Sequence, residues 1–146
     1  MNPASPLLGA RFRDSCTFRA RYAPRVSAFD DLTAMSPLAI WDGVVARVVN
    51  GERLTLAVVE LDPGAVVAQH SHDNEQLGIV LHGLITLHVG QEERELAPGG
   101  TWRIDSDTPH DAHAGPQGAV VIDVFAPRRA DWDEAERREP HRPRWP

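Results

Sequence analysis

The sequence contains no lysine, so all 15 of its basic side chains are arginines. This absence excludes Schiff-base chemistry through a lysine amine. If the protein forms an enolate, a metal ion or an acid–base pair must therefore stabilise the charge. The single cysteine, Cys16, cannot form an internal disulfide, which favours a reducing compartment and predicts a cytoplasmic protein.

Two further absences concern binding partners. No stretch reaches the roughly 20 apolar residues of a membrane span, and the arginine-containing N-terminus lacks the apolar run of a signal peptide. The formal net charge of −6 at pH 7 argues against a nucleic acid partner, and no DNA-binding helix-turn-helix pattern is present. We therefore expect a small-molecule ligand, with no membrane and no nucleic acid.

The 146 residues predict one domain with an irregular segment at each end. Residues 1–34 form an N-terminal arm that is either partly disordered or packed on its own barrel or a second subunit through Phe12, Phe18 and Tyr22. Residues 35–130 form the domain itself.

The Pro- and Arg-rich residues 131–146 form a C-terminal tail. We expect this tail to be solvated, with one short helix inside residues 131–139 and with Trp132 and Trp145 as its anchors.

Short β-branched runs, separated by turn residues, follow one another from Pro37 onward. Asn50-Gly51 between two apolar runs is a strong hairpin signal. No helical pattern longer than two turns occurs before residue 130. The sequence therefore predicts an all-β sandwich or barrel, with strands near 38–41, 44–49, 53–61, 65–71, 75–82, 84–90, 92–96, 101–104, 109–114 and 118–126.

A group of polar residues in this predicted barrel has the pattern of a metal site. His70 and His72 are two apart in a run typical of a strand, so both imidazoles can point to one face. Gln76 follows across a short turn, and His110 comes where a second strand can bring it alongside. A His-x-His pair alone is more often two half-buried polar residues, but the added Gln76 and His110 favour a site.

We predict that these four residues bind one divalent ion. Imidazole ligands suit zinc, which we expect, and also iron, nickel and manganese. Since three histidines and a carboxamide carry no negative charge, the ion would act as a strong Lewis acid. The remaining histidines, His82, His88, His113 and His141, are predicted to be surface or structural residues.

The spacing of these residues resembles the two cupin motifs. Residues 64–83 read Gly64-x5-His70-x-His72-x3-Gln76-x6-Gly83, and residues 99–110 read Gly99-x5-Asp105-x-Asp107-x2-His110. The resemblance covers about residues 38–131 and implies a cupin double-stranded β-helix, a jelly-roll barrel. The sequence departs from the usual pattern at Gln76, where most cupins have a glutamate ligand, at Asp105 and Asp107 in place of proline and glycine, and at Ala114 in place of asparagine.

The resemblance is closer to small single-domain cupins with a glutamine ligand. Residues 123–132, Asp123-Val-Phe125-Ala-Pro-Arg-Arg129-Ala-Asp131-Trp, are similar to a segment of that subgroup. It includes enzymes that linearise unsaturated uronates from pectin and alginate, in which the matching aspartate, phenylalanine and arginine line the cavity. The resemblance thus implies roles for Asp123, Phe125 and Arg129. An Asp123–Arg ion pair at the barrel rim is the structural alternative.

The predicted cavity is mostly apolar, which indicates an aromatic or polyketone substrate rather than a sugar acid with many polar contacts. Our leading prediction is a metal-dependent polyketide cyclase or aldol-type enzyme, as in antibiotic biosynthesis. Asp123 would be the base that takes the α-proton, with His82 a poorer candidate, and Arg129 would be a second catalytic residue. The cavity wall is predicted to comprise Val80, Ile85, Leu87, Trp102, Ile104 and Phe125.

Three other functions remain open. One is a sugar-acid isomerase acting on an unsaturated uronate, which the match at Asp123, Phe125 and Arg129 favours. Another is an iron-dependent dioxygenase, and the third is a non-enzymatic ligand-binding cupin. Exposed sheet edges also predict a homodimer.

Overall fold

The structure, a computed structural model, describes residues 27–146, so the predicted anchors Phe12, Phe18 and Tyr22 lie outside it. Alternating apolar and polar runs form strands, and η1 and η2 are single-turn 3₁₀ helices. Neither of these helices has the length and apolar character needed to cross a bilayer. The elements are η1 (Leu32–Ala34), β1 (Leu38–Trp41), β2 (Val44–Asn50), β3 (Thr55–Leu61), β4 (Val66–His70), β5 (Glu75–Val89), β6 (Glu92–Leu96), β7 (Thr101–Ile104), β8 (His110–Ala126) and η2 (Ala130–Glu134).

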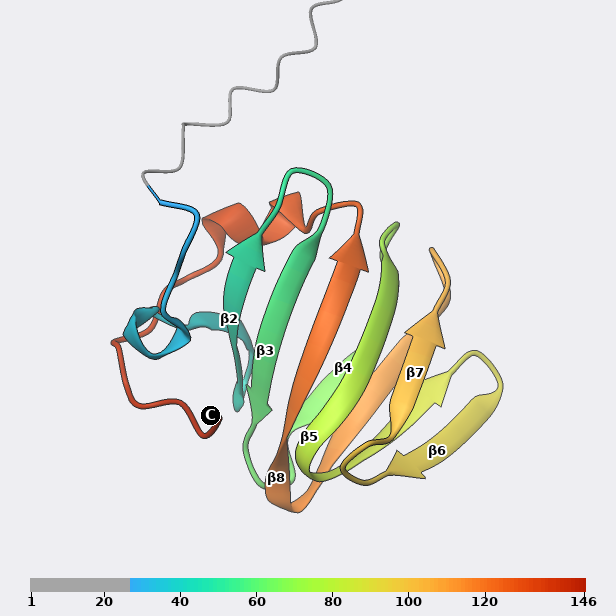
Figure 1. Cartoon of the computed structure of the whole chain (residues 1–146). Coiled ribbons are helices and arrows are strands. Elements are labelled where there is room, and N and C mark those ends of the chain that lie inside the picture. Colours follow the sequence, from blue (N-terminus) through green and yellow to red (C-terminus); the bar gives the residue numbers. More distant parts are fainter. Residues whose placement is uncertain (1–26) are drawn as a thin grey trace, which may run out of the picture.

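The strands form two layers that share β5 and β8, which are antiparallel partners along most of their length (Figure 1). The first half of β5 pairs with β7, and the second half of β8 pairs with β3, which gives one layer in the order β1-β2-β3-β8-β5-β7. The other halves pair with β6 and β4, which gives the order β4-β8-β5-β6. This arrangement confirms the predicted all-β jelly-roll barrel.

Two glycine positions let β5 and β8 pass from one layer to the other. Gly83 has φ +75°, and a Cβ on it would lie 2.0 Å from the carbonyl oxygen of Gly118, whose φ is +74°. The β5–β8 register shifts on either side of Gly83, between Val80 and His82 and between Gly83 and Ile85. The prediction of strand ends at these glycines is therefore wrong, because each glycine accommodates a bulge rather than a turn.

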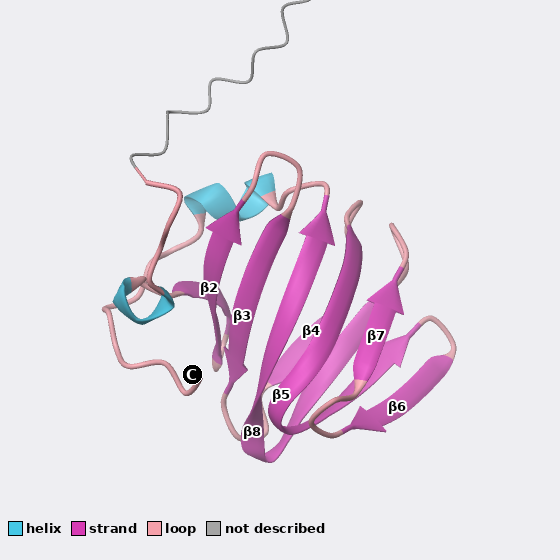
Figure 2. Ribbon diagram, in the orientation of Figure 1, coloured by secondary structure: helices cyan, strands magenta, loops and turns pink. Residues whose placement is uncertain are grey.

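The two layers of strands face each other (Figure 2). The hydrophobic core fills the space between them. Strand alternation places Val80 on its inward face, and the bulge at Gly83 moves the inward phase by one residue, so that Ile85 and Leu87 also point inward. All three side chains are buried, and Phe125 of β8 packs with them at 2% exposure. Trp132 of η2 packs against this core, as expected of a tail anchor.

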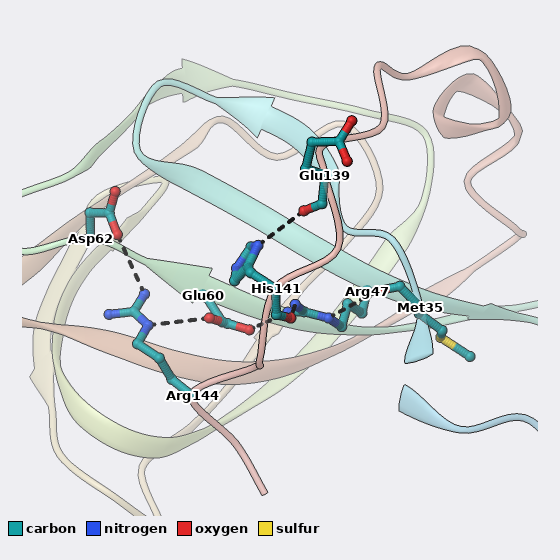
Figure 3. Close-up of polar contacts among 7 residues, drawn as sticks. All are labelled: Met35, Arg47, Glu60, Asp62, Glu139, His141 and Arg144. Carbon is teal, nitrogen blue, oxygen red and sulfur yellow. Dashed lines mark hydrogen bonds and ion pairs between the residues drawn. The ribbon is translucent and has the colours of Figure 1, made fainter. Parts of the chain in front are cut away.

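The C-terminal tail, most of whose side chains are exposed, is attached to β2 and β3 by polar contacts (Figure 3). Arg47, which is 0% exposed, pairs with Glu60 and also donates to the carbonyl oxygen of His141 at 2.7 Å and of Met35 at 3.3 Å. Arg144 donates to the second oxygen of Glu60 at 3.3 Å. A buried ion pair is stable only if the remaining N–H groups of the arginine have acceptors. The tail supplies one such acceptor, the carbonyl oxygen of His141.

The predicted helix within residues 131–139 is shorter than expected, because η2 ends at Glu134. Beyond it, Arg138 N–H donates to the carbonyl oxygen of Pro37, and the Glu136 carbonyl oxygen accepts from Ala39 N–H. The chain here follows β1 as an extended segment.

Candidate metal centre

The barrel brings together the four residues with the predicted metal-site pattern. His70 ends β4 and is the register partner of His110, which begins β8. His72 lies in the turn just after β4, and Gln76 follows on β5. Ligand atoms of the three histidines all lie within 4.8 Å of one another, and the His70 and His110 ring centroids are 4.3 Å apart.

Each of these imidazoles has its Nδ1 fixed by a backbone carbonyl. His70 pairs with Ala68 O at 2.9 Å, His72 with Asn74 O at 3.0 Å and His110 with Thr108 O at 2.8 Å. Because a carbonyl oxygen can only accept, Nδ1 carries the hydrogen and Nε2 keeps its lone pair. A hydrogen bond from Nδ1 to a carbonyl oxygen is typical of histidines that bind metal through Nε2.

Gln76 is oriented in the same way by Asp123. Its Nε2 donates to Asp123 Oδ1 at 2.7 Å, which turns its Oε1 toward Nε2 of His72 at 3.3 Å. With Nδ1 of His72 protonated, two lone pairs face each other at this distance. A cation bound by both atoms would remove the repulsion, so the donor set fits a metal ion.

Burial keeps the imidazoles of His72 and His110 neutral. Burial lowers the pKa of His110 to about 4, and burial together with the charge of Arg129 lowers the pKa of His72. Asp123 responds in the opposite direction, because burial raises its pKa to about 7 against smaller opposing effects of Gln76, Trp102 and Arg129. Neutral imidazoles are the form that binds metal.

A pocket opens beside this cluster. His70, Gln76, His110, Asp123 and Arg129 line its polar side. Apart from Asp111, its remaining wall is apolar, with Ile40, Trp41, Val44, Val59, Leu61, Val67, Ile85, Leu87, Trp102, Ala112, Val121, Phe125 and Trp132.

Four of the six predicted cavity residues, Ile85, Leu87, Trp102 and Phe125, line this pocket. Val80 and Ile104 do not, although each is only 1% exposed. Strand alternation correctly predicts that both side chains are buried. Val80 packs within the core cluster outside the pocket lining, and Ile104 is the register partner of Gln76 on the edge strand β7.

Arg129 projects over two aromatic rings at the pocket. Its guanidinium carbon lies 5.0 Å from the Phe125 centroid and 4.4 Å from the Trp132 centroid. Nε and one Nη2 hydrogen donate to the two carboxylate oxygens of Asp131, at 2.9 and 2.7 Å. Within residues 27–146 no side chain or backbone oxygen accepts from Nη1, so one edge of the fork is available to a ligand.

Trp102 lies beside the Asp123 carboxyl. Its Nε1 is buried and lowers the pKa of Asp123 against the larger effect of burial. The indole covers Gly78, where a Cβ would lie 2.1 Å from ring atoms. Gly78 therefore permits the position of Trp102 against the sheet.

Two residues that support the site were not identified from the sequence. Asn74 is 4% exposed, holds His72 through its carbonyl oxygen, and donates its own amide to Pro127 O. Trp41 lies 5.4 Å from the His70 ring at the pocket. Asn74 follows Asp73 in an ordinary turn signal, and only the long-range contact with Pro127 distinguishes it.

The remaining predicted surface histidines lie outside the pocket. His82 and His141 do not line it, and His88 and His113 lie on the opposite face of the β5–β8 sheet.

Comparison with known proteins gives consistent matches. A model of the cupin domain matches residues 57–125. The pectin degradation protein KdgF of Dickeya dadantii (strain 3937) is 29% identical over 105 residues, which cover 70% of this chain and 94% of that protein. The structure of KdgF from Halomonas sp. is 30% identical, with a TM-score of 0.67 over 72% of this chain and 97% of that one.

An RmlC-like cupin from Shewanella frigidimarina NCIMB 400 has the same TM-score of 0.67 at 24% identity, over 72% of this chain and 95% of that one. At this identity the match supports the fold alone.

Proposed function

The chain belongs to the cupin family, and from this membership we propose that it is a metal-dependent enzyme that opens the ring of an unsaturated uronate. The observation that carries the proposal is one pocket that contains the histidine cluster, a buried carboxyl at Asp123 and the available edge of Arg129. The likeness to pectin degradation proteins supports a substrate derived from pectin.

This proposal replaces the leading prediction of a polyketide cyclase, which the comparisons do not support. The cyclase prediction rested on an apolar cavity with one clear polar donor. The pocket also has the carboxyl of Asp123 and an edge of Arg129 that is unpaired among the described residues, within a mostly apolar wall. A uronate offers a hydroxyl to the first and a carboxylate to the second.

His70, His72, His110 and the amide oxygen of Gln76 would hold a divalent ion, with zinc the expected one. When bound, the ion supplies Lewis-acid polarisation of a substrate oxygen. Because all four protein ligands are neutral, the ion keeps its full charge.

Arg129 binds the substrate carboxylate through its Nη1 edge. Asp131 holds the opposite edge of the guanidinium with two hydrogen bonds, so the fork is already oriented when the substrate arrives. Phe125 and Trp132 pack against the guanidinium and exclude water from it. This arrangement fixes the uronate relative to Asp123.

Asp123 moves the proton. In the unsaturated uronate, C1 carries a hemiacetal hydroxyl and the C4=C5 double bond is joined to the ring oxygen. Removal of the hydroxyl proton by Asp123 breaks the C1–O5 bond, which gives an aldehyde at C1 and an enolate at C5. Return of the proton to C4 gives the ketone, so the reaction is an isomerisation without oxidant or water. A pKa of about 7 suits a group that both accepts and donates a proton near neutral pH.

The test is loss of the ultraviolet absorbance of the C4=C5 bond when purified metal-loaded protein is mixed with an unsaturated galacturonate monomer. The rate should exceed spontaneous ring opening and should fall by about 100-fold or more in Asp123→Asn. Asp105→Asn, an exposed substitution of the same kind, should keep the full rate. A wild-type rate equal to the spontaneous one would exclude this function.

A further inference from the structure

A second group of metal-ligand side chains lies on the outer face of the barrel. Nδ1 or Nε2 of His88, a carboxylate oxygen of Asp111 and a ring nitrogen of His113 all lie within 4.8 Å of one another. His88 follows the buried Leu87 in β5, and His113 follows the buried Ala112 in β8. Because neighbouring residues of a strand point to opposite faces, both imidazoles lie on the outer face. The two imidazoles therefore point away from the pocket, whereas Asp111 also borders it.

Strand register, rather than flexible loops, sets this geometry. His88 of β5 is the direct partner of Asp111 of β8, and Asp111 and His113 share a face because they are two residues apart. Nδ1 of His88 lies 2.7 Å from Asp111 Oδ1, and Nε2 of His113 lies 3.5 Å from the same oxygen. The backbone thus already brings together three metal-ligand side chains from the two strands β5 and β8.

Glu93 adds the feature that distinguishes this group from an ordinary polar patch. It is the register partner of His88 across β5 and β6, and its carboxylate lies 2.7 Å from Nε2 of His88. A carboxylate can accept the Nε2 hydrogen and so leave the Nδ1 lone pair directed at Asp111 and His113. Metal-bound histidines commonly have this carboxylate partner on the other ring nitrogen.

We propose that His88, Asp111 and His113 form a second binding site for a divalent first-row transition metal such as Zn²⁺. Bonds of about 2.0–2.2 Å to nitrogen and oxygen require ligand atoms roughly 3.4 Å apart in a tetrahedral site. The distances of 2.7 and 3.5 Å to Asp111 Oδ1 bracket that value, so small side-chain rotations suffice. Solvent completes the coordination, because the His113 side chain is 51% exposed.

The ion would connect β5 to β8 on the face opposite His110, which immediately precedes Asp111. The site does not depend on the proposed uronate chemistry, because neither of its imidazoles lines the pocket, which only Asp111 borders, and its test measures metal alone. Without an ion, a protonated His88 donates to the carboxylates of both Asp111 and Glu93, and a bound ion would displace the Nδ1 proton.

The experiment is titration of Zn²⁺ into metal-free full-length protein in competition with a chromophoric chelator. Wild type should bind two equivalents, and His70→Ala should keep the outer equivalent. His113→Ala should keep the inner one, and the His70→Ala/His113→Ala double variant should bind neither. His141→Ala, an exposed histidine elsewhere, is the matched control and should bind two equivalents.

Glu93→Gln keeps all three outer ligands. It should lower the affinity of the outer site for Zn²⁺ by about 10- to 100-fold, since it removes the ionised partner of His88. Circular dichroism should show native folding for His113→Ala, because the side chain is half exposed. A single equivalent in wild type, or two equivalents retained in His113→Ala, would overturn the proposal.

Discussion

Asp123→Asn should abolish ring opening and yet stabilise the metal-free fold at alkaline pH. Asp123 is 7% exposed, and its burial raises the pKa from 3.8 to about 7. Each pKa unit corresponds to about 1.4 kcal/mol, so ionising this carboxyl inside the barrel costs up to about 4 kcal/mol. Asparagine keeps an amide oxygen that can accept from Gln76 but has no charge to bury.

The sign of the pH dependence follows from proton binding. Between about pH 4 and pH 7 the folded state keeps the Asp123 proton that the unfolded state has lost. Wild-type stability therefore falls as pH rises through this window and stops falling above the folded pKa. Asp123→Asn lacks this loss, so its advantage over wild type should grow by about 2–3 kcal/mol from pH 5 to pH 8.

The measurement is chemical denaturation of both metal-free proteins at several pH values, with the free energy of unfolding extrapolated to water. Asp105→Asn replaces an exposed carboxylate and should differ from wild type by less than about 0.5 kcal/mol throughout. An advantage of Asp123→Asn that does not change between pH 5 and pH 8, or that shrinks, would refute the assignment of a buried, costly carboxylate.

Three further predictions follow from contacts in the pocket. Gly78→Ala should destabilise the fold by about 1–3 kcal/mol in chemical denaturation, because its Cβ displaces the Trp102 indole, and an unchanged midpoint would contradict that packing. Arg129→Gln should raise KM for the uronate by about tenfold or more in steady-state kinetics, whereas Arg128→Gln should not, and equal effects would remove Arg129 as the carboxylate partner. Gln76→Glu should retain metal in elemental analysis but lower turnover, because a carboxylate ligand reduces Lewis acidity; unchanged turnover would count against a neutral-ligand site.

The fold was predictable because barrel strands carry their signal locally. Alternation placed β1, β6 and β7 at their observed bounds. Gly83 and Gly118 misled the prediction, since a bulge and a turn both use a residue with positive φ. Only the pairing of β5 with β8, which is not local, distinguishes a strand that bends from one that ends.

The sequence predicted which residues form the candidate site, but not which buried residues line the pocket or hold the histidines in place. Spacing identified His70, His72, Gln76 and His110, and the barrel brings them together. Strand alternation could not show that Val80 lies outside the pocket lining, because it predicts only the face of the sheet to which a side chain points.

Long-range contacts were equally invisible to local patterns. The contact between Glu60 and Arg144 joins residues 84 apart, so the tail's attachment could not be seen in the sequence. The homodimer, the cytoplasmic location and the choice of zinc stay predictions.

The pairing of β4 with β8 has a consequence for how the protein folds. His70 and His110 are partners across that pairing, and loop closure over such a separation belongs to the slow, non-local part of folding. The three histidines therefore do not come together until β4 pairs with β8. An ion added during refolding should leave the earlier steps unchanged, and the time at which binding first becomes possible would mark this pairing. The metal centre would then report when one long-range contact of the barrel forms.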